Sequence, residues 1–216
     1  MILSPAEVAA RFESLGGGGL NANGWAFGCE FGFFQRHHGV DPLGLLRWAS
    51  IAPVDLLRGL LCQFKGVEDE AAIEMREHTD WDWGVTQKTY RMYLDHSGMR
   101  RTEVSRDEAA RRIARSLGRL RERFIEDLAV GEKLFVYRTY DHTLPEAALE
   151  ALSGVLKRRG TGTLCYVQPA DTDHPAFTAE RRHESLIVGR IDWFAPQKGE
   201  MNYSGWEAAC RAMLQV

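Results

Sequence analysis

The longest amphipathic pattern of the chain lies in the segment 105–131. Apolar residues recur there every three or four positions, which is the period of one face of an α-helix, at Ala109, Ile113, Leu117, Leu120, Phe124 and Leu128. Ser105 and Glu108 have the spacing of a capping box at the start of this helix. Its many arginines alternate with acidic residues, so we interpret them as a solvated face and assign them no function.

Helices are also predicted in the first half of the chain. The serine, proline and glutamate of SPAE begin a helix that we expect to continue to about Ser14. A second helix is expected from near Cys29 to Gly39. The leucine-rich segment 41–64 is expected to form two short helices, because Pro53 disfavours helical geometry in the residue before it and suits a helix start.

Strand-like runs dominate the second half of the chain. They are KLFVYRTY (133–140), TLCYVQP (163–169) and SLIVGRIDWF (185–194). A helix is predicted between the first two runs, at 143–160, and the order strand, helix, strand predicts a right-handed parallel crossover.

Two further segments around Leu15 and at 90–94 are strand candidates that would extend this sheet. The polar segment 170–184 is expected to be a surface loop. Together the elements predict one α/β domain over residues 1–216, with a mixed or parallel sheet flanked by helices and a helical N-terminal half.

The composition suits a single globular core, since 44% of the 216 residues are hydrophobic and 26% are charged. The net charge of −3 gives no reason to expect nucleic acid or an anionic membrane as a partner. The N-terminus has no signal-peptide pattern and no run approaches the roughly 18 apolar residues of a membrane span, so we expect a cytoplasmic protein.

The cysteines are widely spaced and form no CxxC pair: Cys29, Cys62, Cys165 and Cys210. We therefore expect free thiols, with neither a disulfide framework nor a zinc site. The segment HTDWDWG (78–84) has metal-ligand spacing but no second cluster of ligands, so no metal is predicted and its tryptophans are expected to pack inward. The four-glycine run is not a phosphate-binding loop, because no lysine follows it.

Cys29 is the candidate nucleophile. It follows the glycine-rich stretch LGGGGLNANGWAFG and is predicted at the first turn of a helix, where the helix N-terminus stabilises a thiolate. Gly24 and Gly28 would let the chain turn tightly and leave backbone N–H groups free to bind an oxyanion. The alternative interpretation is a buried structural cysteine among nearby phenylalanines, at Phe27, Phe31, Phe33 and Phe34.

A Cys–His site needs an imidazole within hydrogen-bond reach of the sulfur. His96 is the first candidate, because it ends an aromatic strand directly before a turn, although a surface turn histidine is an alternative interpretation. His142, which follows the strand at 133–140, is the alternative base. His37 and His38 belong to the helix behind Cys29, and His37 would lie about 12 Å along it, so neither is expected to act as the base.

A third polar group should fix the tautomer of the base. Asp192 at the end of the last predicted strand is our candidate, and Asp141 is its competitor. A structural pairing of Asp192 with an arginine such as Arg190 is the alternative interpretation.

Several segments occur in a fixed order between Phe12 and Trp206: FESLGG, GCEFGFFQRHHGVDPLGLLRWASI, MYLDHSG, FIEDLAVGEKLFVYR, LCYV and LIVGRIDWFAP. In these segments the chain resembles a family of bacterial proteins described as papain-like cysteine peptidases. The resemblance implies papain-like character, with Cys29 as the family's cysteine, which follows an SLG motif and begins a helix, and His96 as its histidine.

The stretch between the SLG motif and Cys29 is longer here than in many members of that family. Asn23 lies within it, six residues before Cys29, where papain-like enzymes place a glutamine. We therefore name Asn23 and Gly28 as candidates for the oxyanion-binding loop.

These features predict a cysteine-dependent hydrolase that acts on an acyl or peptide-like bond and needs no cofactor. Cys29 would attack a carbonyl carbon, His96 would transfer the proton and an acidic residue would orient His96. Two alternatives remain open, namely a thiol-dependent acyltransferase in polysaccharide modification and a non-catalytic module that binds glycan or protein. The binding module would use the tryptophans at Trp25, Trp48, Trp81 and Trp83. No substrate is predicted.

Overall fold

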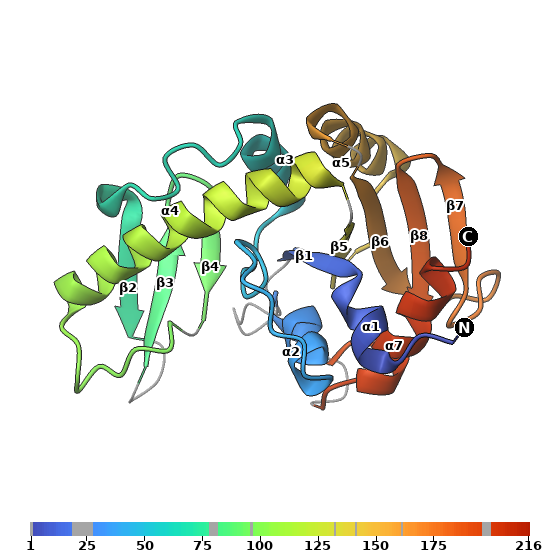
Figure 1. Cartoon of the computed structure of the whole chain (residues 1–216), viewed down its shortest axis with the longest axis horizontal. Helices are drawn as coiled ribbons and strands as arrows, with labels where there is room; N and C mark the ends of the chain where they lie inside the picture. Colours follow the sequence, from blue (N-terminus) through green and yellow to red (C-terminus); the bar gives the residue numbers. More distant parts are fainter. Residues whose placement is uncertain are drawn as a thin grey trace.

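The computed structural model describes residues 2–18, 28–77, 82–95, 97–131, 133–140, 142–160, 162–195 and 200–216. Its main sheet has five strands in the order β1-β5-β6-β8-β7 (Figure 1). The strands are β1 (Phe12–Gly18), β5 (Leu134–Thr139), β6 (Thr163–Pro169), β8 (Leu186–Ile191) and β7 (Ala179–His183). The first four are parallel and β7 is antiparallel at one edge, so the expected α/β class with a mixed sheet is confirmed.

Helices cover both faces of the main sheet (Figure 1). One face carries α3 (Pro53–Leu61), α4 (Arg106–Val130) and α5 (Glu146–Arg159), and the other carries α1 (Pro5–Ala10), α2 (Glu30–His37) and α7 (Tyr203–Met213). Along β5, Phe135 and Tyr137 belong to the first apolar core and Val136 belongs to the second. Strands buried on both faces read as continuous apolar runs, which is why the sequence pattern locates β5, β6 and β8 well.

A second, antiparallel sheet lies beside the main one and contains β2 (Ile73–Glu77), β3 (Trp83–Gln87) and β4 (Met92–Leu94), preceded by the short 3-10 helix η1 (Glu70–Ala72). Helix α4 runs from this sheet toward α5 (Figure 1). Ser50 connects the two sheets, because it bridges to Gly17 of β1 and to Tyr93 of β4. The strand expected at 90–94 therefore exists, but it belongs to the second sheet.

Other elements predicted from the sequence are present in the structure. The long helix is α4, with Ser105 as its N-cap and Gly131 in a left-handed conformation at its C-cap. The helix expected at 143–160 is α5, and the segment near Leu15 forms β1 beside β5. The first half of the chain contributes β1 to β4 in addition to the helices expected there.

Three local predictions are wrong. Helix α1 ends at Ala10 and does not continue to Ser14, because residues from Phe12 onward are buried in strand β1. The segment 41–49 contains a turn instead of a helix, and it wraps around the buried guanidinium of Arg47, which donates to the carbonyl groups of Val40 and Pro42.

The third wrong prediction is the surface loop at 170–184, since residues 179–183 form the edge strand β7. Most of its side chains are exposed and charged, so the strand has no hydrophobic alternation that the sequence could reveal. Within the described ranges, none of the helices combines the length and apolarity that crossing a bilayer requires.

Candidate active site

Cys29 is the N-cap residue of α2, the first helix after β1. Phe33 N–H donates to the carbonyl of Cys29 over 3.0 Å, which closes the first turn. The amides of residues 30–32 precede this bond and have no partner within the helix, so they form its partly positive end. The Cys29 side chain makes no capping hydrogen bond. The predicted helix start at Cys29 is confirmed.

Gly28 is required here because the chain approaches its neighbour very closely. A Cβ atom at this position would lie 1.8 Å from the carbonyl oxygen of Ala49. The glycine therefore allows the start of α2 to pack against the segment that carries Ser50. Asn23 and Gly24, the other loop candidates, lie outside the described residues.

Cys29 lies in a pocket of about 460 Å³. Helix α2 supplies two further lining residues, Phe33 and Arg36, which lie four and seven positions after Cys29 and so share its face of the helix. Trp48 completes this side, with its ring 5.2 Å from that of Phe33 and the Arg36 guanidinium carbon 4.5 Å from its centroid. One wall of the pocket is thus aromatic, with a cation beside it.

The opposite side of the pocket comes from the chain that follows β4, at Asp95, Ser97 and Gly98. The buried carboxylate of Asp82 holds this segment, because its Oδ1 accepts hydrogen bonds from the Ser97 hydroxyl (3.0 Å) and the Met99 amide (3.1 Å). The pocket therefore forms where α2 of the main sheet meets the second sheet.

His96, the predicted base, lies outside the described residues. Its two neighbours in the chain, Asp95 and Ser97, both line the pocket that contains Cys29. Sequence reasoning missed Asp95, although it directly precedes His96 in the motif MYLDHSG.

The other predicted site residues have separate surroundings. His142 is exposed just after β5, and its carbonyl accepts a hydrogen bond from the Thr139 hydroxyl. Asp192 is exposed just after β8, and its Oδ1 accepts a hydrogen bond from the Asn202 side chain over 2.7 Å. Because Asn202 is the N-cap of α7, Asp192 supports the start of that helix. Neither His142 nor Asp192 is among the described lining residues of the Cys29 pocket, and Asp141 lies outside the described residues.

Burial raises the pKa of the Cys29 thiol to about 11, against the lowering effect of the nearby Arg138 guanidinium. The carboxylates of Asp95 and Glu30 raise it further. A thiol with this pKa is protonated at neutral pH, so nucleophilic attack by Cys29 requires a base that removes its proton.

The sequence analysis also missed a buried ion pair directly after Cys29. Glu30 Oε2 lies 3.1 Å from Arg138 Nη2, and both side chains are almost fully buried. A signal existed in the sequence, because an arginine in the otherwise apolar run KLFVYRTY and a glutamate in GCEFG are both unusual at buried positions.

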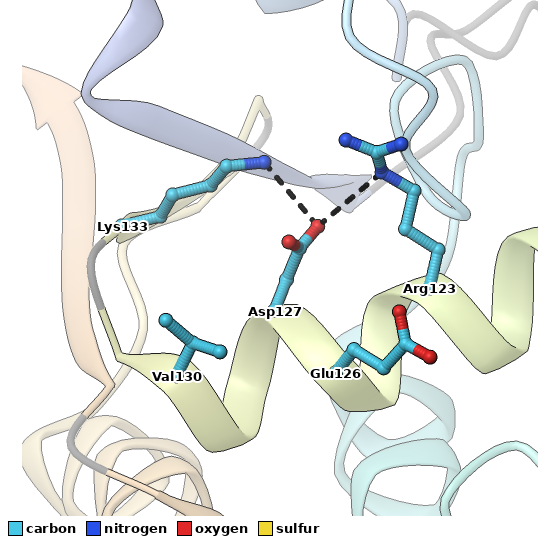
Figure 2. A pocket seen from close by; sticks show the side chains of 5 residues that line it. All are labelled: Arg123, Glu126, Asp127, Val130 and Lys133. Carbon is cyan, nitrogen blue, oxygen red and sulfur yellow. Dashed lines mark hydrogen bonds and ion pairs between the residues drawn. The ribbon is translucent and has the colours of Figure 1, made fainter.

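A second cavity, of about 290 Å³, lies beside the C-terminal end of α4 (Figure 2). Lys133 there lies 3.2 Å from Asp127 and 3.1 Å from the buried Glu13, while Arg123 lies 3.9 Å from Asp127. These charges neutralise one another, and no thiol lines this cavity among the described residues.

No group of three or more potential metal ligands occurs in the described part of the chain. Residues 78–81 of the HTDWDWG segment lie outside that part, whereas Trp83 packs inward as expected, with its indole N–H donating to the Val104 carbonyl. Comparison of the chain with family models, curated proteins and solved structures found no match.

Proposed function

We propose that this protein is a cysteine-dependent hydrolase with Cys29 as its nucleophile and His96 as its base. The observation that carries the proposal is the shared pocket: Cys29 at the start of α2 faces the segment that holds both neighbours of His96. The resemblance to papain-like cysteine peptidases suggests the same two residues.

The reaction would proceed in two steps. The imidazole takes the proton of the Cys29 thiol as the sulfur attacks a carbonyl carbon, and it returns this proton to the leaving amine or alcohol when the bond to that group breaks. Water then attacks the thioester, the acid leaves and the thiol is regenerated. A thiol that is protonated at rest is compatible with this order, because the proton moves during the attack.

The start of α2 would stabilise the oxyanion that forms during each attack. Its first-turn amides lie next to Cys29, and the helix dipole favours negative charge at this end. Asp95 would favour the positive charge on the imidazole from within the same pocket. We therefore propose Asp95, in place of Asp192, as the carboxylate that supports the base.

p-Nitrophenyl acetate is a suitable probe, because an activated ester acylates a nucleophilic thiol without specific substrate contacts. We expect an acetyl adduct on Cys29, detected by peptide mass spectrometry, that forms and then disappears by hydrolysis. Cys29→Ala should abolish this turnover and His96→Ala should reduce it by at least about 100-fold. Cys62→Ser is the matched control, since Cys62 is an exposed thiol outside the described lining of the pocket, and this variant should retain wild-type turnover.

The proposal fails if Cys29→Ala hydrolyses the ester as fast as the wild type, or if an adduct on Cys29 forms but never turns over. Transfer of the acetyl group to an added sugar, faster than to water, would favour the acyltransferase alternative. The binding-module alternative loses one of its four tryptophans, because Trp83 is buried in the core.

A further inference from the structure

Glu30 directly follows Cys29 in the chain, and its buried carboxylate has more hydrogen-bond and ion-pair partners than a surface carboxylate usually has. Its Oε2 atom faces Arg138 Nη2 (3.1 Å) and accepts a hydrogen bond from the Tyr140 hydroxyl (3.0 Å). Its Oε1 atom accepts hydrogen bonds from the Ala195 amide (2.9 Å) and the Trp206 indole N–H (3.1 Å). Both oxygens therefore have two donors each, and the carboxylate is fixed in one orientation.

Arg138 lies on β5, opposite Gly17 of β1 in the register of the parallel sheet. A Cβ atom at Gly17 would lie 3.5 Å from the guanidinium carbon of Arg138 and 3.2 Å from the Cα atom of Gly28. The guanidinium and the residue before Cys29 thus flank the same small space. The Tyr140 ring lies on the guanidinium, with its centroid 3.5 Å from Cζ.

This arrangement places a fixed positive charge next to the start of α2. We propose that Arg138 is a positioning residue of the Cys29 site: held by Glu30, its guanidinium favours the ionised sulfur and anchors the helix start from within the protein. The proposal rests on the function proposed above and adds a group that acts through Cys29 without touching a substrate.

An arginine suits this task better than a lysine. Burial lowers the pKa of Arg138 only to about 10, opposed by Glu30 and Cys29, so its charge persists at neutral pH. The charged groups that act on the Cys29 sulfur are Arg138, which lowers its pKa, and Asp95 and Glu30, which raise it, while Arg36 lines the same pocket. Opposite substitutions within the ion pair should therefore shift the reactivity of Cys29 in opposite directions.

The test measures the alkylation rate of Cys29 by iodoacetamide between about pH 7 and pH 10 with peptide mass spectrometry, since each unit of pKa changes the thiolate fraction about tenfold below the pKa. Arg138→Met should slow alkylation at neutral pH by up to about tenfold, because it removes the favourable charge. Glu30→Gln should accelerate alkylation severalfold, because it removes an unfavourable charge. Arg138→Lys keeps a cation without the guanidinium fork, so it should react faster than Arg138→Met but more slowly than the wild type.

Two kinds of thiol serve as controls in every variant. Cys62 is exposed and should react at the wild-type rate, whereas Cys165 and Cys210 are buried in the core and should stay unlabelled while the fold is intact. A variant that merely loosens the structure would make Cys165 accessible to iodoacetamide. It would also speed the alkylation of Cys29, whichever of the two charges it removes. Opposite shifts at Cys29 with unchanged controls therefore support a charge effect.

The proposal is overturned if Arg138→Met remains folded and keeps the wild-type pH profile at Cys29. If Arg138→Met does not fold, the test rests on Glu30→Gln. The proposal is then overturned if Cys29 in Glu30→Gln has the same pH dependence of alkylation as in the wild type. The measurement needs no substrate, so it is separate from the ester assay. Opposite shifts without any ester turnover would refute the proposed hydrolase and leave the charge coupling in place.

Discussion

Glu30 and Glu13 are both buried carboxylates that pair with a cation, at opposite ends of β5. Glu30 pairs with Arg138 near the end of the strand, beside Cys29, and both side chains are almost entirely buried. Glu13 pairs with Lys133 just before the strand, and Lys133 is 23% exposed and also contacts Asp127 (Figure 2). The first pair is closed within the protein, whereas the second shares its cation with another carboxylate and with solvent.

This difference in burial determines how strongly the cation of each pair acts on neighbouring groups. A cation whose partner is fixed and whose access to water is blocked exerts a strong field on its neighbours, because little solvent screens it. A cation that can turn to a second carboxylate or to water exerts a weaker and more adaptable field. We therefore associate the closed pair with Cys29, the proposed nucleophile, and the open pair with stability alone.

The largest expected contrast is in stability. Glu30→Ala would break the buried ion pair with Arg138, so we expect the free energy of unfolding to fall by about 3–5 kcal/mol. Glu13→Ala would leave Lys133 paired with Asp127, so we expect a loss of only about 1–2 kcal/mol. Urea unfolding of the two variants measures both values, and equal losses would contradict the distinction between a closed and an open pair.

A smaller contrast is expected between Gly28, which directly precedes Cys29 and Glu30 in the chain, and Gly44, which packs against Glu13. An added Cβ in Gly28→Ala would collide with the Ala49 backbone carbonyl at 1.8 Å, so we expect a cost of about 3 kcal/mol and altered alkylation of Cys29. In Gly44→Ala the nearest atom is Glu13 Oε1 at 2.1 Å, the end of a side chain that can move, so we expect about 1 kcal/mol.

Thermal unfolding measures the stability of Gly28→Ala and Gly44→Ala relative to the wild type, and Gly118→Ala is the control. Gly118 lies inside α4 with only ordinary van der Waals contact to Glu68, so alanine should stabilise this helix by about 0.5–1 kcal/mol. A Gly28→Ala protein as stable as the wild type would show that the start of α2 is adaptable, and it would weaken the case for a rigid Cys29 site.

The sequence predicts those parts of the fold whose signal is local or periodic. Helix α4 and strand β6 follow directly from apolar spacing, because the apolar residues that the pattern marks are buried in the core or packed against it. Strand β7 escapes prediction because its ladder partner supplies the backbone hydrogen bonds while its side chains remain polar and exposed. The end of α1 depends on burial of β1 between other elements, which short-range helix signals do not encode.

The same limit applies to the candidate site. Cys29 at a helix start could be predicted, since glycines before it and helical periodicity after it are both local features. The pairing of Glu30 with Arg138 joins residues far apart in the chain and depends on the parallel register of β1 and β5. Asp192 was correctly placed at the end of a strand, but its partner Asn202 comes from the start of α7, which the sequence analysis did not predict.

The smallest expected effect is the pH dependence of the open pair. Burial raises the pKa of Glu13 above its ordinary value of 4.5, although Lys133 opposes the shift. The folded protein therefore holds this proton more tightly than the unfolded chain does, so the contribution of Glu13 to stability is full below about pH 4.5 and declines as the pH rises through the folded value. Glutamine does not titrate, so the stability of the wild type relative to Glu13→Gln should fall as the pH rises above about 4.5.

Asp41 provides a control of opposite sign. Its hydrogen bond with Arg47 lowers the pKa of its carboxyl group, so this contribution is present above the ordinary pKa and is lost as the pH falls through the folded value. The stability of the wild type relative to Asp41→Asn should therefore increase with pH over the acidic range. The stability of the wild type relative to Glu13→Gln should decrease as the pH rises. Melting temperatures of the three proteins at a series of pH values test both signs. If the stability of the wild type relative to Glu13→Gln also increased with pH, the attraction of Lys133 would outweigh the effect of burial on Glu13. The Glu13–Lys133 pair would then be closed, as the Glu30–Arg138 pair is.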